Sequence, residues 1–67
     1  MKIYYNDILT DLPEDYMTLE GLAKWKNLPQ TGTAIAVNNK VVRKSQWPVF
    51  NLSENDHVAV ITAAFGG

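Results

Sequence analysis

The stretch that decides the fold is His57-Val58-Ala59-Val60-Ile61-Thr62-Ala63, near the end of a chain of 67 residues. Its β-branched residues and its length predict a β-strand. Because successive side chains of a strand point to opposite faces, one face carries Val58, Val60 and Thr62 and the other carries Ala59, Ile61 and Ala63. Both faces are largely apolar, and one of them should belong to the core.

The face that carries Ala59, Ile61 and Ala63 is predicted to dock a partner protein. An exposed apolar strip on a small soluble domain usually marks such a surface. The strip also leads toward the last residues of the chain. The residues alone leave a second possibility open, in which other parts of the same chain cover this face.

A β-hairpin is predicted at the start of the chain. Residues 2–6 and 8–12 have the alternation of side chains that is typical of strands, and Asn6-Asp7 between them has the composition of a tight turn. Pro13-Glu14-Asp15 ends the second strand.

A second pair of strands is predicted in the middle of the chain. Residues 33–38 form a compact β-branched run, as expected of a buried central strand. A turn at Asn38-Asn39 then leads into a short return strand, Val41-Val42.

One short helix is predicted over residues 18–26. Thr18 is a good N-cap residue, and Glu20 lies in the first turn, where the helix dipole favours an anion. Gly21 costs the helix about 1 kcal/mol relative to alanine. We therefore expect the helix to depend on docking against the sheet through Leu19 and Leu22, with Trp25 or Leu28 adding to the contact.

A single helical turn is predicted over residues 43–47, ending before Pro48 with Trp47 directed inward. The order of elements is then strand, strand, helix, strand, short strand, helical turn, strand. This order predicts an α+β fold of the β-grasp, ubiquitin-like type, with one helix packed on one face of a mixed sheet of four to five strands. We expect this domain to span residues 1–63 and a flexible C-terminal tail to span residues 64–67.

The composition excludes several classes of function. Six basic and seven acidic residues leave a net charge of −1, which argues against binding to nucleic acid or to an anionic membrane. The chain has no cysteine for a disulfide or a thiolate metal site. It shows no apolar signal region and no run near the roughly 18 apolar residues of a membrane span. The expectation is a cytoplasmic protein that is a monomer when free.

No group of residues in the sequence suggests catalysis or metal binding. His57 is the single histidine, and a lone histidine at the start of a strand is usually a surface residue. Glu14, Asp15, Glu54 and Asp56 lie in predicted turns, where acidic residues commonly cap and solubilise. We therefore predict no catalytic residue, no metal site and no bound cofactor, and we do not expect an enzyme.

The last two residues, Gly66-Gly67, are the remaining candidate for chemistry. Glycine has no Cβ, so a chain end of this kind can enter a narrow channel and approach the reacting centre of another protein. Its terminal carboxylate would be ionised, because the reference pKa of an α-carboxyl group is about 3.3–3.7. The alternative is a frayed end without a function.

Several short motifs, taken together in their order and spacing, resemble a known family. They are Ile3-x-x-Asn6, Thr18-Leu19-x-x-Leu22, Ala36-Val37-Asn38, Val41-x-Arg43-x-x-x-Trp47, Leu52-x-Glu54-x-Asp56-x-Val58 and the terminal Gly66-Gly67. Over nearly the whole length, the chain resembles the sulfur carrier proteins of thiamine biosynthesis, the ThiS family. That family often has Gly where Asp7 and Asn55 stand here, and often Pro where Val42 stands.

The resemblance implies a reaction at Gly67. In this family an ATP-dependent, ubiquitin-activating-like enzyme adenylates the C-terminal glycine, and the product is converted to a thiocarboxylate that donates sulfur to a thiazole synthase. ATP is used by the activating enzyme and is not bound by the carrier. Ala64, Phe65 and Gly66 would form the tail that enters both partners, and Ala59, Ile61 and Ala63 would dock their surfaces.

Three alternatives remain open from the sequence. The small subunit of molybdopterin synthase has a similar fold and a similar Gly-Gly end, although it tends to be longer. A ubiquitin-like protein modifier would join the same tail to a lysine. A β-grasp interaction module would use its surface and leave the terminus unreacted.

Overall fold

The computed structural model describes residues 1–29 and 31–62. Its five strands, in chain order, are β1 (Lys2–Tyr5), β2 (Ile8–Asp11), β3 (Thr33–Val37), β4 (Lys40–Val42) and β5 (His57–Thr62). The helical elements are the α-helix α1 (Leu19–Trp25) and the 3₁₀ helices η1 (Glu14–Tyr16) and η2 (Lys44–Val49). None of the helices in the described ranges is long and apolar enough to span a membrane.

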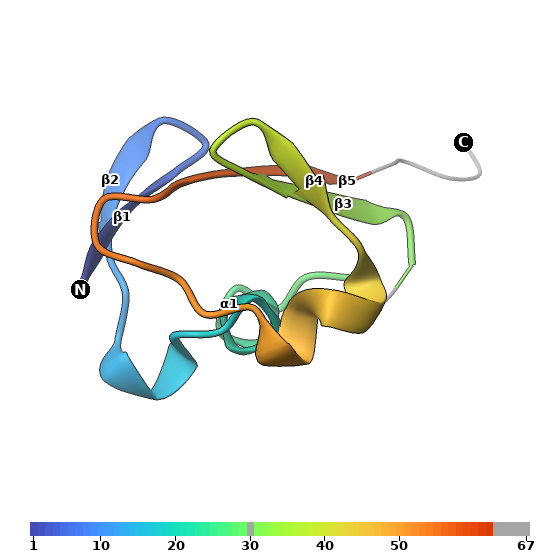
Figure 1. Ribbon diagram of the computed structural model, residues 1–67, viewed down its shortest axis with the longest axis horizontal. Helices are drawn as coiled ribbons and strands as arrows, with labels where there is room; N and C mark the ends of the chain where they lie inside the picture. The colour runs from blue at the N-terminus through green and yellow to red at the C-terminus, as the bar shows by residue number, and fades with distance from the viewer. Residues whose placement is uncertain (30, 63–67) are drawn as a thin grey trace.

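The five strands form one mixed sheet in the order β2-β1-β5-β3-β4, so β5 is the middle strand. β5 runs parallel to β1 and antiparallel to β3. All three helical elements lie on the same side of the sheet (Figure 1). The predicted α+β, β-grasp arrangement with one main helix on a mixed sheet is therefore confirmed.

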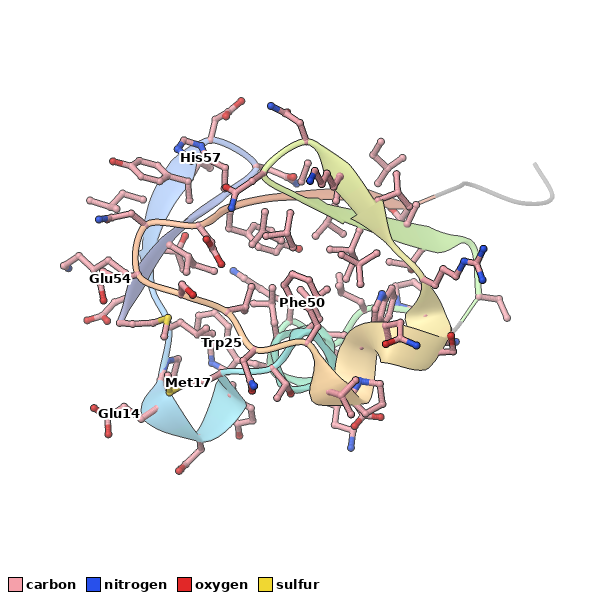
Figure 2. All side chains as sticks on the ribbon, in the orientation of Figure 1. Glu14, Met17, Trp25, Phe50, Glu54 and His57 are labelled. Atoms are coloured by element: carbon pink, nitrogen blue, oxygen red, sulfur yellow. The ribbon has the colours of Figure 1, made fainter. Side chains whose placement is uncertain are left out.

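The core lies between the sheet and α1. Its fully or almost fully buried residues come from both layers and from the segment that crosses between them: Ile3, Leu12, Leu19, Leu22, Ile35, Val37, Trp47, Leu52 and Val58. Figure 2 shows Phe50 pointing from the crossing segment into the space between the layers. Val58 is buried and Val60 is half-buried, so these two residues of β5 form its core face, while Thr62 on the same face is exposed.

The helix begins and ends as predicted. Thr18 is the N-cap of α1, and its Oγ1 accepts a hydrogen bond from the backbone N–H of Gly21 at 3.0 Å. Leu19 and Leu22 are completely buried against the sheet, whereas Trp25 and Leu28 are half-buried at its edge. The expected dependence of this short helix on tertiary packing is consistent with that burial.

The two hairpin turns use a backbone conformation that few residues adopt. Asn6 and Asp7 have φ of 48° and 68°, and Asn38 and Asn39 have φ of 51° and 71°. Positive φ at both central residues is the geometry of a type I′ turn, whose twist matches that of the paired strands. Asn55, with φ of 68°, and Asp7 therefore stand at positions where glycine would be accommodated without steric cost.

Three local predictions need correction. The helical turn at 43–47 does not end before Pro48, because η2 continues to Val49. The fixed φ of proline fits a 3₁₀ helix, and Phe50 N–H closes the last turn on the carbonyl of Trp47 at 3.3 Å. The acidic segment after Pro13 forms η1 as well as ending the hairpin. β3 is an interior strand but is buried on one face only, since Ala34 is exposed.

Gly21 has a packing role that helix propensity does not predict. A Cβ at this position would lie 2.9 Å from Cα of Tyr16 and 3.3 Å from Oγ1 of Thr18. Gly21→Ala should therefore lower the free energy of unfolding by about 1–3 kcal/mol through overpacking, although alanine would normally stabilise a helix by about 1 kcal/mol. Urea denaturation measures the change, with Lys24→Ala in the same helix as the control. A variant as stable as the unaltered protein would contradict this reading.

Candidate functional site

The outer face of β5 is uncovered by the described chain. Ala59 is exposed, and Ile61 retains 69% of its accessible surface. Ala34 lies directly opposite Ile61 on β3. Val41, which is 77% exposed, lies on the same face of β4. We call these four residues, Ala34, Val41, Ala59 and Ile61, the outer apolar patch.

The patch residues alternate along the strands with the buried Ile35 and Val58, so they lie on the face of the sheet opposite the core. The helical elements lie on the core side of the sheet (Figure 1). Ala59 and Ile61 are exposed, and none of the described residues covers them. Their docking to a partner protein stays a prediction. Ala63, the third residue of the predicted docking strip, lies outside the described residues. The tail residues Ala64, Phe65, Gly66 and Gly67 also lie outside them, so the assignments made for them remain predictions.

Two asparagine side chains form hydrogen bonds with the backbone of β5, Asn6 from the β1 side and Asn38 from the β3 side. Asn6 Oδ1 accepts from the backbone N–H of Val60 at 2.7 Å, and Asn6 Nδ2 donates to the carbonyl of Val60 at 3.3 Å. Asn38 Oδ1 accepts from the N–H of His57 at 2.9 Å, and Asn38 Nδ2 donates to Oδ1 of Asp56 at 3.0 Å. The strand that leads to the chain end is thus fixed by side chains as well as by its ladders.

Sequence reasoning missed this function of Asn6 and Asn38. It assigned both residues to turns because asparagine tolerates the left-handed backbone, and that assignment is correct. The available signal was their common placement, since each asparagine directly follows a strand that pairs with β5. An amide at that place can replace main-chain hydrogen bonds where the ladder stops.

His57 has a packing role in this structure. Its ring stacks on Tyr4 with the centroids 4.4 Å apart and an angle of 11° between the planes. The imidazole lies on the outer side of the sheet (Figure 2). No cluster of three or more potential metal ligands is found among residues 1–29 and 31–62.

Tyr5 is half-buried and packs against the core. Burial raises the pKa of the Tyr5 phenol above its ordinary value, because desolvation disfavours the charged phenolate. Lys26 Nζ lies 4.6 Å from the centroid of this ring and 4.9 Å from that of Trp25. These contacts join the C-terminal end of the helix to the sheet and hold no group in a reactive geometry.

Two hollows on the described surface are lined by titratable residues. One, of about 250 Å³, lies between α1 and η2 and includes Glu20, Lys24 and Lys44. The other, of about 320 Å³, lies at the start of β5 and includes Asp7 and His57. Neither lining brings a nucleophile together with a base and an orienting partner, which a catalytic arrangement requires.

The comparisons with known proteins agree with this geometry. The crystal structure of a thiamine biosynthesis protein (ThiS) from Geobacter metallireducens aligns with a TM-score of 0.83 over 100% of both chains at 14% identity. At that identity the likeness shows the fold alone. No curated protein sequence matches the chain.

Family membership follows from a match of the sequence itself. The model of the ThiS family matches residues 3–67, which is almost the whole chain. Proteins of this family carry sulfur and are not enzymes. The chain therefore belongs to the ThiS family, the sulfur carrier proteins of thiamine biosynthesis.

Proposed function

We propose that the carboxylate of Gly67 is the sulfur-carrying group of this protein. A carboxylate oxygen attacks the α-phosphorus of ATP on the activating enzyme, so that pyrophosphate leaves and an acyl adenylate forms. Sulfide-level sulfur, HS⁻ from the sulfur source, then attacks the carbonyl carbon: the new C–S bond replaces the C–O bond to AMP, AMP leaves, and loss of the proton gives the thiocarboxylate. Adenylation is needed because an ionised carboxylate is a poor electrophile and AMP is a good leaving group.

The observation that carries this proposal is the placement of β5. It is the middle strand of the sheet, and it runs directly toward the tail. Both of its neighbours hold it, β1 in parallel and β3 in antiparallel register. A firmly held strand gives the tail a defined starting point, and glycines at its end would allow close approach to a partner's reacting centre.

The outer apolar patch supplies the docking surface in this proposal. Ala59 and Ile61 would contact the activating enzyme and later the thiazole synthase, and Ala63 would extend the contact toward the tail. The body of residues 1–63 thus binds, and residues 64–67 reach into the partner. ATP belongs to the activating enzyme, and the carrier acts as a monomer that is passed between two partners.

Intact mass spectrometry tests the reaction. The purified chain is incubated with ATP, a sulfur source and an activating enzyme that is proven on a known carrier. The expected result is the mass gain of one oxygen replaced by one sulfur, located at Gly67 by fragmentation. No gain under conditions where the known carrier is loaded would overturn the proposal, and an isopeptide bond to a lysine would indicate a protein modifier instead.

Ile61→Glu tests the docking surface. The charge would have to be desolvated in an apolar contact, so affinity for the activating enzyme should fall at least about tenfold. Isothermal titration calorimetry measures the dissociation constant. Val49→Glu is the matched control, because Val49 is also 69% exposed but lies on η2, away from the outer apolar patch. Equal affinities of the two variants would place the docking surface elsewhere.

A further inference from the structure

We infer that Asn6 is a positioning residue for the C-terminal tail, an inference that rests on the proposed reaction at Gly67. Asn6 and Val60 are 54 residues apart in sequence. The side chain of Asn6 nevertheless makes two hydrogen bonds to the backbone of Val60. The backbone N–H of Asn6 also donates to the carbonyl of Val58 at 2.8 Å. One residue thus contacts β5 at three backbone atoms.

The backbone geometry explains why a side chain is needed here. The parallel register between β1 and β5 ends at Tyr5 and Val58. At Asn6 the positive φ of 48° turns the chain into the hairpin, so the main chain of β1 no longer follows β5. The amide of Asn6 then supplies the acceptor and the donor that Val60 would otherwise receive from a longer strand.

Val60 is the last residue of β5 that the described structure holds from the β1 side. On the other side the register with β3 continues to Thr62. Main-chain pairing on this side reaches Val58, whose carbonyl accepts from the N–H of Asn6. Beyond it, Val60 is bonded on this side by the side chain of Asn6. Without the amide, the end of β5 would be held by β3 only, and the direction of the chain beyond Thr62 would be less defined.

The bonds from Asn6 to Val60 matter because the proposed reaction takes place at Gly67, several residues beyond the end of the sheet. Gly67 lies seven positions after Val60, a span of up to about 25 Å when extended. An activating enzyme that binds the outer apolar patch also has to receive the terminus, and the effective concentration of the tail depends on how its starting point is held. A displacement at the end of β5 therefore shifts the region that the terminus can reach.

Asparagine at position 6 combines two properties that other residues do not offer together. Asparagine tolerates positive φ, and its planar amide offers one acceptor and one donor group with the spacing of a peptide unit. Glycine at this position would keep the turn but remove both bonds to Val60. Aspartate would keep the acceptor oxygen but could not donate to the Val60 carbonyl.

Asn6→Gly is the test variant, and Asn55→Gly is its matched control. Asn55 also has a positive φ, 68°, and is exposed, and no hydrogen bond of its side chain is found among the described residues. Both variants are assayed well below their melting temperatures, with folding checked by circular dichroism. The readouts are the KM of the activating enzyme for the carrier and the hydrogen exchange rate of the Val60 amide.

For Asn6→Gly we expect KM to rise about fivefold or more, the effect of losing roughly one net hydrogen bond, with kcat changed much less. The Val60 amide should exchange at least about tenfold faster, because its acceptor is gone. Asn55→Gly should leave both quantities near those of the unaltered protein. If Asn6→Gly does not fold, Asn6→Asp and Asn55→Asp carry the same comparison of KM.

The outcomes separate this inference from the proposed function. If the unaltered chain gains no sulfur, the reaction at Gly67 is wrong, and the role of Asn6 falls with it. If the unaltered chain is loaded and both variants of a pair show the same KM, the role of Asn6 is overturned and the proposed function stands. A raised KM for the Asn6 variant alone supports the inference.

Discussion

Adding one alanine after Gly67 should abolish sulfur loading. The extension moves the terminal carboxylate by one residue, about 3.5 Å, and places a methyl group beside it. A displacement of about 1 Å can already cost a hundredfold in an enzyme-catalysed step, so we expect loss of at least about that factor. Glycine has no Cβ, and the channel that accepts the tail would have to accommodate the new side chain.

The measurement is again intact mass spectrometry, as a time course with ATP, a sulfur source and the activating enzyme. The extended chain keeps every core residue, so its melting temperature should equal that of the unaltered protein. This thermal measurement is the control for folding. Loading of the extended chain at the normal rate would show that the position of the carboxylate does not matter, and it would remove Gly67 from its proposed role.

Trp47→Ala should have the largest effect on stability. Trp47 is 5% exposed, and its indole Nε1 donates to the carbonyl of Val42 at 3.0 Å. Truncation of a buried aromatic residue costs about 3–5 kcal/mol. A domain of this size has a total stability of about 3–10 kcal/mol, so the variant should be largely unfolded or only marginally folded at 37 °C.

Trp47→Phe separates packing from hydrogen bonding at this site. Phenylalanine keeps most of the buried apolar surface but leaves the Val42 carbonyl without the indole donor, which should cost about 1–3 kcal/mol. Urea denaturation followed by far-ultraviolet circular dichroism measures all three proteins. If Trp47→Ala unfolds at the same urea concentration as Trp47→Phe, the proposed importance of the buried ring is wrong.

The local elements were predictable because their signals lie within a few residues. The alternation in β5 identified Val58 and Val60 as the core face and Ala59 and Ile61 as the outer face, and the structure agrees. Thr18 marked the start of α1 by the chemistry of N-capping. Asn-rich turns predicted both hairpins, since few other residues tolerate the required positive φ.

Local signals were less informative where a residue depends on a distant neighbour. Helix propensity marks Gly21 only as a weak point of α1. The backbone of Tyr16, which leaves no room for a Cβ at this position, belongs to a 3₁₀ turn that the sequence does not predict. The pattern predicts that the helical turn ends before Pro48. The 3₁₀ helix η2 nevertheless contains Pro48, which has no backbone N–H to donate.

The sequence by itself determined the order of the elements, the faces of the strands, the family resemblance and the terminal Gly-Gly. The order of the elements and the faces of the strands follow from periodicity and turn chemistry, which act over a few positions, whereas the resemblance depends on motifs along the whole chain. Only the tertiary structure decided that β5 is the middle strand and that none of residues 1–29 and 31–62 covers its outer face. It also decided that Asn6 reaches Val60 across 54 positions. Such pairings depend on which distant segments bury their apolar faces together, and no local pattern encodes that choice.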